Sequence, residues 1–219
     1  LYSAPTGTLV AAGDPAAGPA LAQAAERSGW RVLIGDAAIC DSLLEAYPRS
    51  FIRRRPAVRE QRFMAAVPEA VGDEPVEGFR SARVADVDRL TEFACRLHVE
   101  DEMGPPVSRS SRPAVRSRML ETVSRGHAWV VERDGQVVAK IDLSLHSRRR
   151  GAQIAGVYVE AAWRGVGVGQ GAVRTLTRRL FEDGLPAVTL HVRADNVAAI
   201  RAYRRASFVD RGAWRLALR

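Results

Sequence analysis

The chain has 219 residues, of which 47% are hydrophobic and 26% are charged, so it is long enough and apolar enough to bury a substantial core. Its formal net charge is +8, which is compatible with nucleic acid, a membrane surface, an acidic partner or a polyanionic ligand. No apolar run reaches membrane-spanning length, and the first residues lack the basic and apolar regions of a signal peptide. We therefore expect a cytoplasmic protein without a membrane partner.

The positive charge comes mostly from arginine and is spread along the chain, with short runs at Arg53–Arg55 and Arg148–Arg150. Neither run contains aromatic residues that could stack on bases, so we do not expect a nucleic-acid partner. Cys40 and Cys95 lie far apart in apolar helical patterns, which predicts buried free thiols rather than a disulfide. The four histidines are scattered, so no metal site is expected.

The first third of the chain predicts a small α/β unit. Hydrophobic periodicity predicts strands at 8–12, 30–34 and 59–67, and helices at 19–28 and 37–47. Gly29 is expected to end the first helix and Pro48 to break the second. The polar segment 71–78 contains Gly and Pro and is predicted to be a linker, which divides the chain into domains at 1–70 and 79–219.

The remainder predicts a longer alternation of strands and helices. Strands are expected at 79–84, 128–132, 136–145, 153–159, 187–192 and 208–218, and helices at 87–99, 112–124, 172–181 and 196–206. Asp86 is expected to cap the first of these helices. Arg133-Asp134-Gly135 is a strong hairpin signal between two strands.

A glycine-rich turn, Arg164-Gly165-Val166-Gly167-Val168-Gly169, stands between an apolar strand and a helical pattern. Glycine lets the main chain approach a ligand without a Cβ in the way. The free N–H groups of the first helical turn, together with the helix dipole, favour a bound anion. The turn therefore predicts a site for a ligand that carries a pyrophosphate.

Two motifs in this order of elements resemble the GCN5-related N-acetyltransferase (GNAT) superfamily. The first is Arg164-x-x-Gly167-x-Gly169 after the fourth strand of the second unit, and the second is Asn196, Ala199 and Tyr203 downstream. The resemblance covers about the last two-thirds of the chain. It implies a fold of the α/β class (α+β type), with a central mixed and mostly antiparallel sheet flanked by helices.

The N-terminal unit resembles the back half of the GNAT-like domain that precedes the catalytic domain in a group of actinobacterial GNAT proteins. Residues 8–67 follow the strand–helix–strand–helix–strand order of such a half-domain. They contain no Arg-x-x-Gly-x-Gly motif, so the resemblance implies a degenerate unit that holds no cofactor.

The resemblance implies acetyl-CoA as cosubstrate. Family members splay two strands at a bulge, where the main chain of Val157 and Val159 would bind the pantetheine amides and a neighbouring N–H would polarise the acetyl carbonyl. Arg164 would lie near the phosphates, or would only be an arginine at a helix start. The residues implied in cosubstrate binding are Val157, Tyr158, Val159, Arg164, Gly165, Val166, Gly167, Val168, Gly169, Asn196, Ala199 and Tyr203.

Tyr203 is the candidate general acid, since its phenol could protonate the leaving thiolate; the alternative is an aromatic ring that packs in the core. Many relatives carry a glutamate on the fourth strand, where this chain has Gln153, so the general base is open. The candidates in the acidic loop that follows the first helix of the second unit are Glu100, Asp101 and Glu102.

A solvated loop end is the alternative interpretation of that acidic segment. His191 could be a base or a structural residue, and Asp142 is a weaker candidate.

We therefore expect an enzyme that moves an acetyl group from acetyl-CoA to a primary amine by direct attack in a ternary complex. The acceptor would be a small amine or a protein lysine or N-terminus, and the acidic loop favours a cationic one. The alternative is a non-catalytic acyl-CoA sensor, which the missing strand carboxylate favours, and a nucleic-acid-binding protein is favoured by net charge alone. A monomer and a homodimer both remain open.

Overall fold

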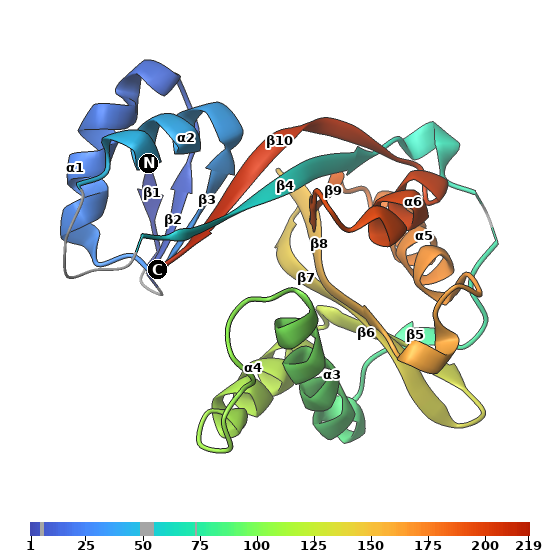
Figure 1. Ribbon diagram of the computed structural model, residues 1–219. Coiled ribbons are helices and arrows are strands. Elements are labelled where there is room, and N and C mark those ends of the chain that lie inside the picture. The colour runs from blue at the N-terminus through green and yellow to red at the C-terminus, as the bar shows by residue number, and fades with distance from the viewer. Residues whose placement is uncertain (5–6, 49–54, 73) are drawn as a thin grey trace. The chain divides into compact units, whose positions relative to one another are not determined.

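The computed structural model describes residues 1–4, 7–48, 55–72 and 74–219 (Figure 1). Part of the predicted arginine run at 53–55 and one residue of the predicted linker at 71–78 lie outside the described residues. The chain divides into two compact units, each assembled from separate stretches of sequence. The first contains Leu1–Phe63, Val192–Asn196 and Asp210–Arg219, and the second contains Met64–His191 and Val197–Val209.

The end of the chain belongs to the first unit, which the predicted domain ranges did not anticipate. Trp214–Leu218 pairs antiparallel with Val32–Asp36, so the last strand completes the N-terminal sheet. The contacts within these two units do not determine which stretch of the chain folds alone. The domains at 1–70 and 79–219 therefore remain a prediction.

The first unit is a small sheet with two helices. Its elements are β1 (Tyr2–Ser3), β2 (Thr8–Ala11), α1 (Gly18–Ser28), β3 (Val32–Asp36), α2 (Ala37–Ala46), the first part of β4 (Ala57–Ala66) and the last part of β10 (Phe208–Leu218). Its strands have the order β1-β2-β3-β10-β4, in which β2 and β3 are parallel. This confirms the predicted alternation of strands and helices, although the strand expected at 30–34 begins two residues later.

Local signals in the sequence set the ends of both helices. Gly29 adopts the left-handed conformation with φ 63° and ends α1, as predicted. The carboxylate of Asp36 accepts a hydrogen bond of 3.0 Å from the N–H of Ala38 and so caps the start of α2. The chain therefore reverses sharply on either side of β3.

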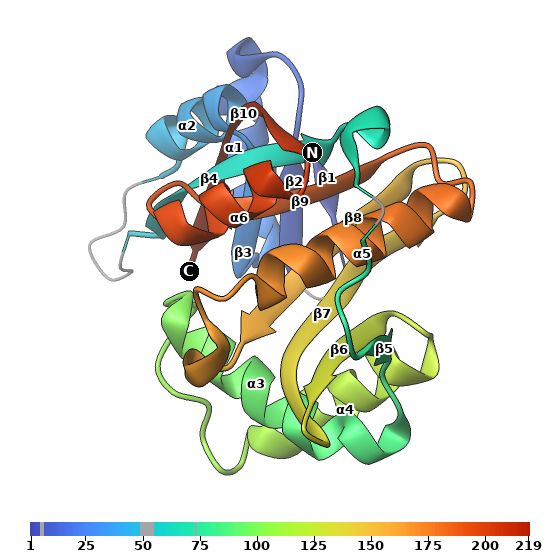
Figure 2. The ribbon, with the colours of Figure 1, turned by 90° about the vertical axis from the view of Figure 1, so that its right-hand side faces the viewer.

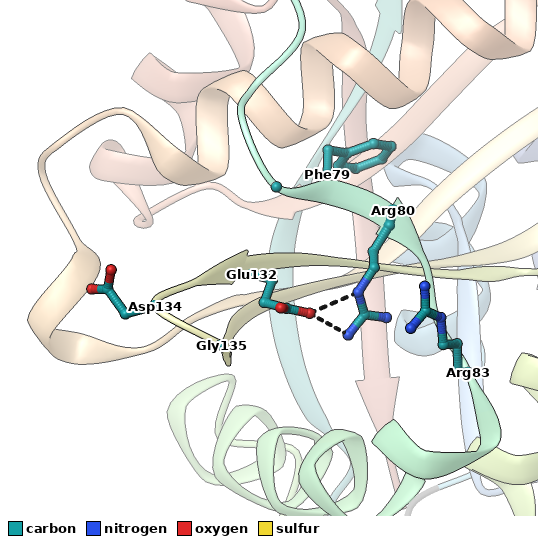
Figure 3. Close-up of a pocket in the computed structure, with 7 residues that line it drawn as sticks. Phe79, Arg80, Arg83, Glu132, Asp134 and Gly135 are labelled. Carbon is teal, nitrogen blue, oxygen red and sulfur yellow. Dashed lines mark hydrogen bonds and ion pairs between the residues drawn. The ribbon is translucent and has the colours of Figure 1, made fainter.

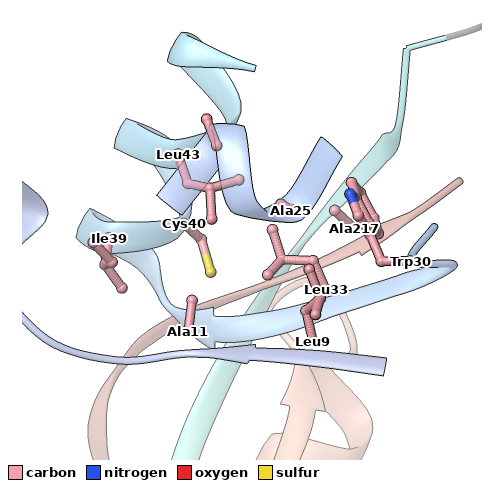
Figure 4. Packing of buried hydrophobic residues seen from close by; sticks show 10 residues of the cluster. Leu9, Ala11, Ala25, Trp30, Leu33, Ile39, Cys40, Leu43 and Ala217 are labelled. Atoms are coloured by element: carbon pink, nitrogen blue, oxygen red, sulfur yellow. The ribbon is translucent and has the colours of Figure 1, made fainter. Parts of the chain in front are cut away.

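The core of the first unit lies between the helices and the sheet (Figure 4). Trp30 is 2% exposed and meets the ring of Tyr47 edge to face, with the centroids 5.8 Å apart. Burial raises the pKa of Cys40 to about 12, so this thiol is an inert core residue, as predicted. Cys95, in contrast, is only half-buried. The buried cluster consists of Leu9, Ala11, Ala22, Ala25, Trp30, Leu33, Ile39, Cys40, Leu43 and Ala217.

The second unit contains the longer sheet and most of the helices. Its elements are β5 (Phe79–Ser81), α3 (Val87–Glu100), α4 (Arg112–Ser124), β6 (Ala128–Arg133), β7 (Gln136–Ser147), β8 (Gly151–Val159), α5 (Val168–Glu182), the first part of β9 (Val188–Arg193) and α6 (Val197–Arg205). The strands have the order β9-β8-β7-β6-β5, and they are antiparallel apart from the β8–β9 pair. This confirms the expected mixed, mostly antiparallel sheet. Among the described residues, no helix has the length and apolar character that a membrane-spanning segment requires.

Helices cover both faces of this sheet (Figure 2). The ring of Tyr158 on β8 packs on Phe93 of α3, with the centroids 4.8 Å apart. The next residue, Val159, points to the opposite face, where its Cγ2 lies 3.1 Å from the position that a Cβ on Gly169 of α5 would occupy. The end of β8 is therefore held between α3 and the first turn of α5.

Asp86 stands at the N-cap position of α3, as expected, but its carboxylate forms no capping hydrogen bond with that helix. Its carboxylate instead accepts hydrogen bonds from Arg80, at 2.8 and 3.0 Å, and from the N–H of Arg83, at 2.7 Å. These bonds close a short 3-10 turn at Val84–Asp86 and end β5 at Ser81 rather than at residue 84. The sequence does not distinguish a carboxylate that caps a helix from one that pairs with an arginine, because both can stand just before the helix.

Asp86→Asn is expected to destabilise the protein by about 2 kcal/mol near neutral pH, because Arg80 loses a charged hydrogen-bond partner. The hydrogen bonds from Arg80 lower the pKa of Asp86, so the stabilisation is present above the pKa of the unfolded chain and is lost as the pH falls through the lower, folded value. Urea unfolding at about pH 7 and about pH 3 measures both free energies. Asp134→Asn, at an exposed hairpin position, is the matched control. A difference between Asp86→Asn and wild type that is as large at about pH 3 as at about pH 7 would contradict this origin.

Candidate functional site

Strand β8 carries a bulge in its second half. Lys140 pairs with Tyr158, and Asp142 pairs with Ala155, so β8 has one more residue than β7 across this interval. Gly156 lies in the bulge and has a left-handed φ of 55°. β8 is the fourth strand of the second unit, where the resemblance to the GNAT superfamily predicts a bulge.

The ladder between β8 and β9 is short. The parallel pairs run from Ala152 with Val188 to Ile154 with Leu190, and the recorded pairing ends there. The bulge follows directly in β8, so the main chain after Ile154 lies beyond this ladder. An extended ligand could add to the edge of β8 from this point onward.

The glycine turn has the geometry of an anion site. Gly165 and Gly167 have φ values of 79° and 88°, and Gly167 is the N-cap of α5. The first helical hydrogen bond joins the N–H of Gly171 to the carbonyl of Gly167 at 2.9 Å. The N–H groups of the three residues between them therefore have no acceptor within the helix. A Cβ at Gly165 or Gly167 would meet nothing within 4 Å, so the backbone conformation, and not a lack of space, favours glycine there.

Arg164 is tied to the surrounding elements. Its Nε donates to the carbonyl of Val159 at 2.8 Å, and its Nη2 donates to both carboxylate oxygens of Glu100 at 2.9 Å. Its guanidinium also lies 5.3 Å from the ring centroid of Tyr158. The arginine therefore joins the end of α3 to the end of β8 and the glycine turn. Glu100, predicted as a catalytic carboxylate, is engaged here as its ion-pair partner.

Tyr203 lies half-buried on α6, with its ring centroid 6.3 Å from that of Phe208. Burial raises the pKa of the phenol, and the negative charge of Asp101 raises it further. The phenol therefore keeps its proton at neutral pH and can act as a donor. The negative charge of one member of the acidic loop therefore acts on the predicted acid.

The remaining predicted residues are placed differently. Glu102 is exposed and has a left-handed φ of 51°. Asn196 directly precedes α6 and is part of the first unit. Its N–H donates a hydrogen bond of 3.1 Å to the carbonyl of Arg193. Ala199 lies in the first turn of α6. Burial lowers the pKa of His191 to about 4, so its imidazole is neutral and weakly basic at neutral pH.

Lys140 was missed by reasoning from the sequence. It is 1% exposed on β7 and forms an ion pair with Asp142, whose residue is 8% exposed. The signal was a lysine and an aspartate two positions apart within a run of apolar strand residues. Two charges on one face of a buried strand imply a buried pair.

A cavity of about 300 Å³ lies beside the β6–β7 hairpin, where Nη2 of Arg80 is 2.7 Å from the carboxylate of Glu132 (Figure 3). Its lining includes none of the predicted site residues. The described residues also contain no group of three or more His, Cys, Asp or Glu side chains arranged to hold a metal ion. The cavity is lined by Gly78, Phe79, Arg80, Arg83, Glu132, Asp134 and Gly135.

Comparison with known proteins gives a match over most of the second unit. A family model described as "Acetyltransferase (GNAT) family" matches residues 92–208. Mycothiol acetyltransferase of Streptomyces coelicolor is 31% identical over 81 residues, which are 37% of this chain and 26% of that protein. The matched part is therefore about a quarter of the length of this curated relative.

Solved structures share the fold. An acetyltransferase of the GNAT family from Colwellia psychrerythraea is 13% identical with a TM-score of 0.64, over 94% of this chain and 72% of that one. A GCN5-related N-acetyltransferase from Kribbella flavida is 17% identical with a TM-score of 0.61, over 95% of this chain and 80% of that one. At these identities the likeness concerns the fold alone.

Proposed function

The chain belongs to the acetyltransferase (GNAT) family, and on that premise we propose that it transfers an acetyl group from acetyl-CoA to a primary amine. The observation that carries the proposal is the left-handed glycine turn at Gly165 and Gly167, which opens α5 directly beside the bulged end of β8. An anion site and an unpaired strand edge in this order suit a ligand with a pyrophosphate at one end and amide groups along its length.

In this proposal the pyrophosphate of acetyl-CoA lies over the free N–H groups of the first turn of α5. The pantetheine arm runs along β8 at Val157, Tyr158 and Val159. The carbonyl of Val159 already accepts a hydrogen bond from Arg164, so the arginine fixes the strand end rather than binding the phosphates alone. Ala199, in the first turn of α6, would contact the same arm.

The chemical step is direct attack of the amine nitrogen on the thioester carbonyl carbon. The C–N bond forms, the C–S bond breaks, and the sulfur leaves as a thiolate that accepts a hydrogen bond from Tyr203. The amine proton passes through water to the acidic loop. We assign that role to a carboxylate of this loop, Glu100, Asp101 or Glu102; that of Glu100 also binds Arg164. Negative charge on this loop favours a cationic acceptor.

A non-catalytic acyl-CoA sensor is the second candidate, and one observation favours it. Gln153 takes the strand position where many family members carry a glutamate, and its side-chain oxygen accepts a hydrogen bond of 2.8 Å from the hydroxyl of Ser144. The side chain of Gln153 is therefore uncharged, and its oxygen already accepts a hydrogen bond. An enzyme with this residue must take its base from another element.

A panel of amines tests the proposal directly. Acetyl-CoA is incubated with the protein and with small amines, amino-acid derivatives and lysine peptides, and free thiol is measured. Turnover with at least one cationic amine is the expected result. Acetyl-CoA binding by calorimetry without turnover across the panel would favour the sensor, and the absence of binding would overturn both candidates.

A further inference from the structure

The ion pair of Lys140 and Asp142 lies inside the second unit, where it is costly. The side chain of Lys140 is 1% exposed and that of Asp142 is 12% exposed, and their residues pair with Val130 and Ala128 on the face covered by α3 and α4. Replacement of a buried ion pair by apolar residues of similar volume is often neutral or stabilising. Stability alone therefore does not explain why two charged residues stand at these buried positions.

The pair lies directly against the bulge of β8. A Cβ built on Gly156 would lie 2.5 Å from Oδ2 of Asp142 and 2.8 Å from Nζ of Lys140. The two charged groups thus occupy the space beneath the bulge, and a side chain at position 156 would collide with both. Gly156 also has a φ of 55°, so the position excludes other residues on two independent grounds.

The carboxyl group of Asp142 retains unused hydrogen-bonding capacity. Its Oδ2 accepts from Lys140, while its Oδ1 is buried and has no hydrogen-bond partner among the described residues. Burial raises the pKa of Asp142, whereas Lys140 and, more weakly, Arg118 on α4 oppose that rise. An ion pair with one unfilled acceptor oxygen therefore lies against Gly156.

We propose that Lys140 and Asp142 are positioning residues, which hold the β8 bulge in the shape that aims the N–H of Val157 at the thioester carbonyl. The pair acts through the main chain and does not contact the substrate. The inference rests on the proposed function, because it assigns a task to the carbonyl-binding part of that site. It requires the bulge to change shape when the pair is removed while the fold survives.

The double variant Lys140→Met/Asp142→Leu tests this inference, because it removes both charges and preserves apolar volume. Single variants leave one buried charge unpaired and are not informative about positioning. Ile141→Val, between the two positions and 1% exposed in the wild type, is the matched control for a change in the same strand. Thermal unfolding establishes that both variants fold.

The first readout is the amide spectrum of the ligand-free protein, which does not depend on activity. The double variant is expected to shift the Gly156 and Val157 amides and to leave the turn at Gly165–Gly169 unchanged. The second readout is the isotope-edited infrared carbonyl stretch of bound acetyl-CoA. Its red shift in the wild type is expected to disappear in the double variant, with kcat lowered about 10- to 100-fold and the KM for acetyl-CoA changed less than about threefold.

Unchanged amide positions at the bulge, or a wild-type carbonyl stretch in the double variant, would overturn the positioning role. If the double variant does not fold, Lys140→Met/Asp142→Asn, which removes both charges and preserves the shape of the Asp142 side chain, is expected to give the same loss of red shift; a wild-type stretch in that variant would also overturn the role. Failure of the wild-type protein to bind acetyl-CoA would instead contradict the proposed function, while the ligand-free amide spectrum still decides the inference.

Discussion

Tyr203→Phe is expected to lower kcat for acetyl transfer about 100-fold and to change the KM for acetyl-CoA less than about threefold. The variant removes one hydroxyl from a half-buried ring on α6 and leaves the ring in place. Its effect is expected in kcat because the leaving sulfur becomes negative only in the transition state. Steady-state release of free thiol with saturating amine measures both constants.

The protonation state of the phenol explains the size of the effect. Burial and the charge of Asp101 raise the pKa of Tyr203, whereas a thiol has a pKa of about 8.5. The phenolate is thus a stronger base than the thiolate. In place of the general-acid role predicted from the sequence, we therefore propose that Tyr203 stabilises the leaving group by donating a hydrogen bond and keeps its proton. Loss of one such donor to a developing anion costs about two to three orders of magnitude in rate.

Tyr47→Phe is the matched control for this variant. Its hydroxyl accepts a hydrogen bond of 2.8 Å from Arg219 in the first unit, outside the proposed site, so the same chemical change there is expected to leave kcat unaltered. Wild-type turnover in Tyr203→Phe would remove this residue from the mechanism. An equal loss of affinity and turnover would indicate a binding role instead.

Gly167→Ala is expected to weaken acetyl-CoA binding at least about tenfold. An alanine at a φ of 88° is strained by about 1–2 kcal/mol, and the chain relieves the strain by turning the first N–H groups of α5 away from their common direction. Those groups form the proposed phosphate site. Isothermal titration with acetyl-CoA measures the change in affinity.

Gly184→Ala separates local strain from ligand binding. Gly184 follows the other end of the same helix with a φ of 80°, and a Cβ there would also meet nothing within 4 Å. The two variants are expected to lose similar stability in urea, about 1–2 kcal/mol each, because the backbone strain is alike. Equal acetyl-CoA affinities in the two variants would show that the turn before α5 does not hold the cosubstrate.

Local patterns in the sequence predicted most elements of this fold. Periodicity placed α1, α2, α3 and α4, and the hairpin signal at Asp134-Gly135 placed the β6–β7 turn. The helix expected to begin at residue 172 begins at Val168, because glycines at 169 and 171 obscure the helical pattern. Each of these features depends on residues that are close in the sequence, so a short segment is enough to predict it.

Interactions between distant residues were not predictable in the same way. Arg164 and Glu100 are 64 residues apart, and no short pattern connects them. The partners of Asp86 and the pair of Lys140 with Asp142 likewise depend on which strands become neighbours. The glycine turn was recognisable because backbone conformation is encoded locally, whereas the roles of its charged neighbours depend on tertiary contacts.

The most direct test of acetyl-CoA binding at the β8–α5 turn is an amide-resolved titration. Isotope-labelled protein is titrated with acetyl-CoA, and the shift of each backbone amide is followed. We predict that the largest shifts fall on residues 155–159 and 165–170. Shifts confined to the cavity that Arg80 and Glu132 line, or no saturable shifts at all, would contradict the proposed site.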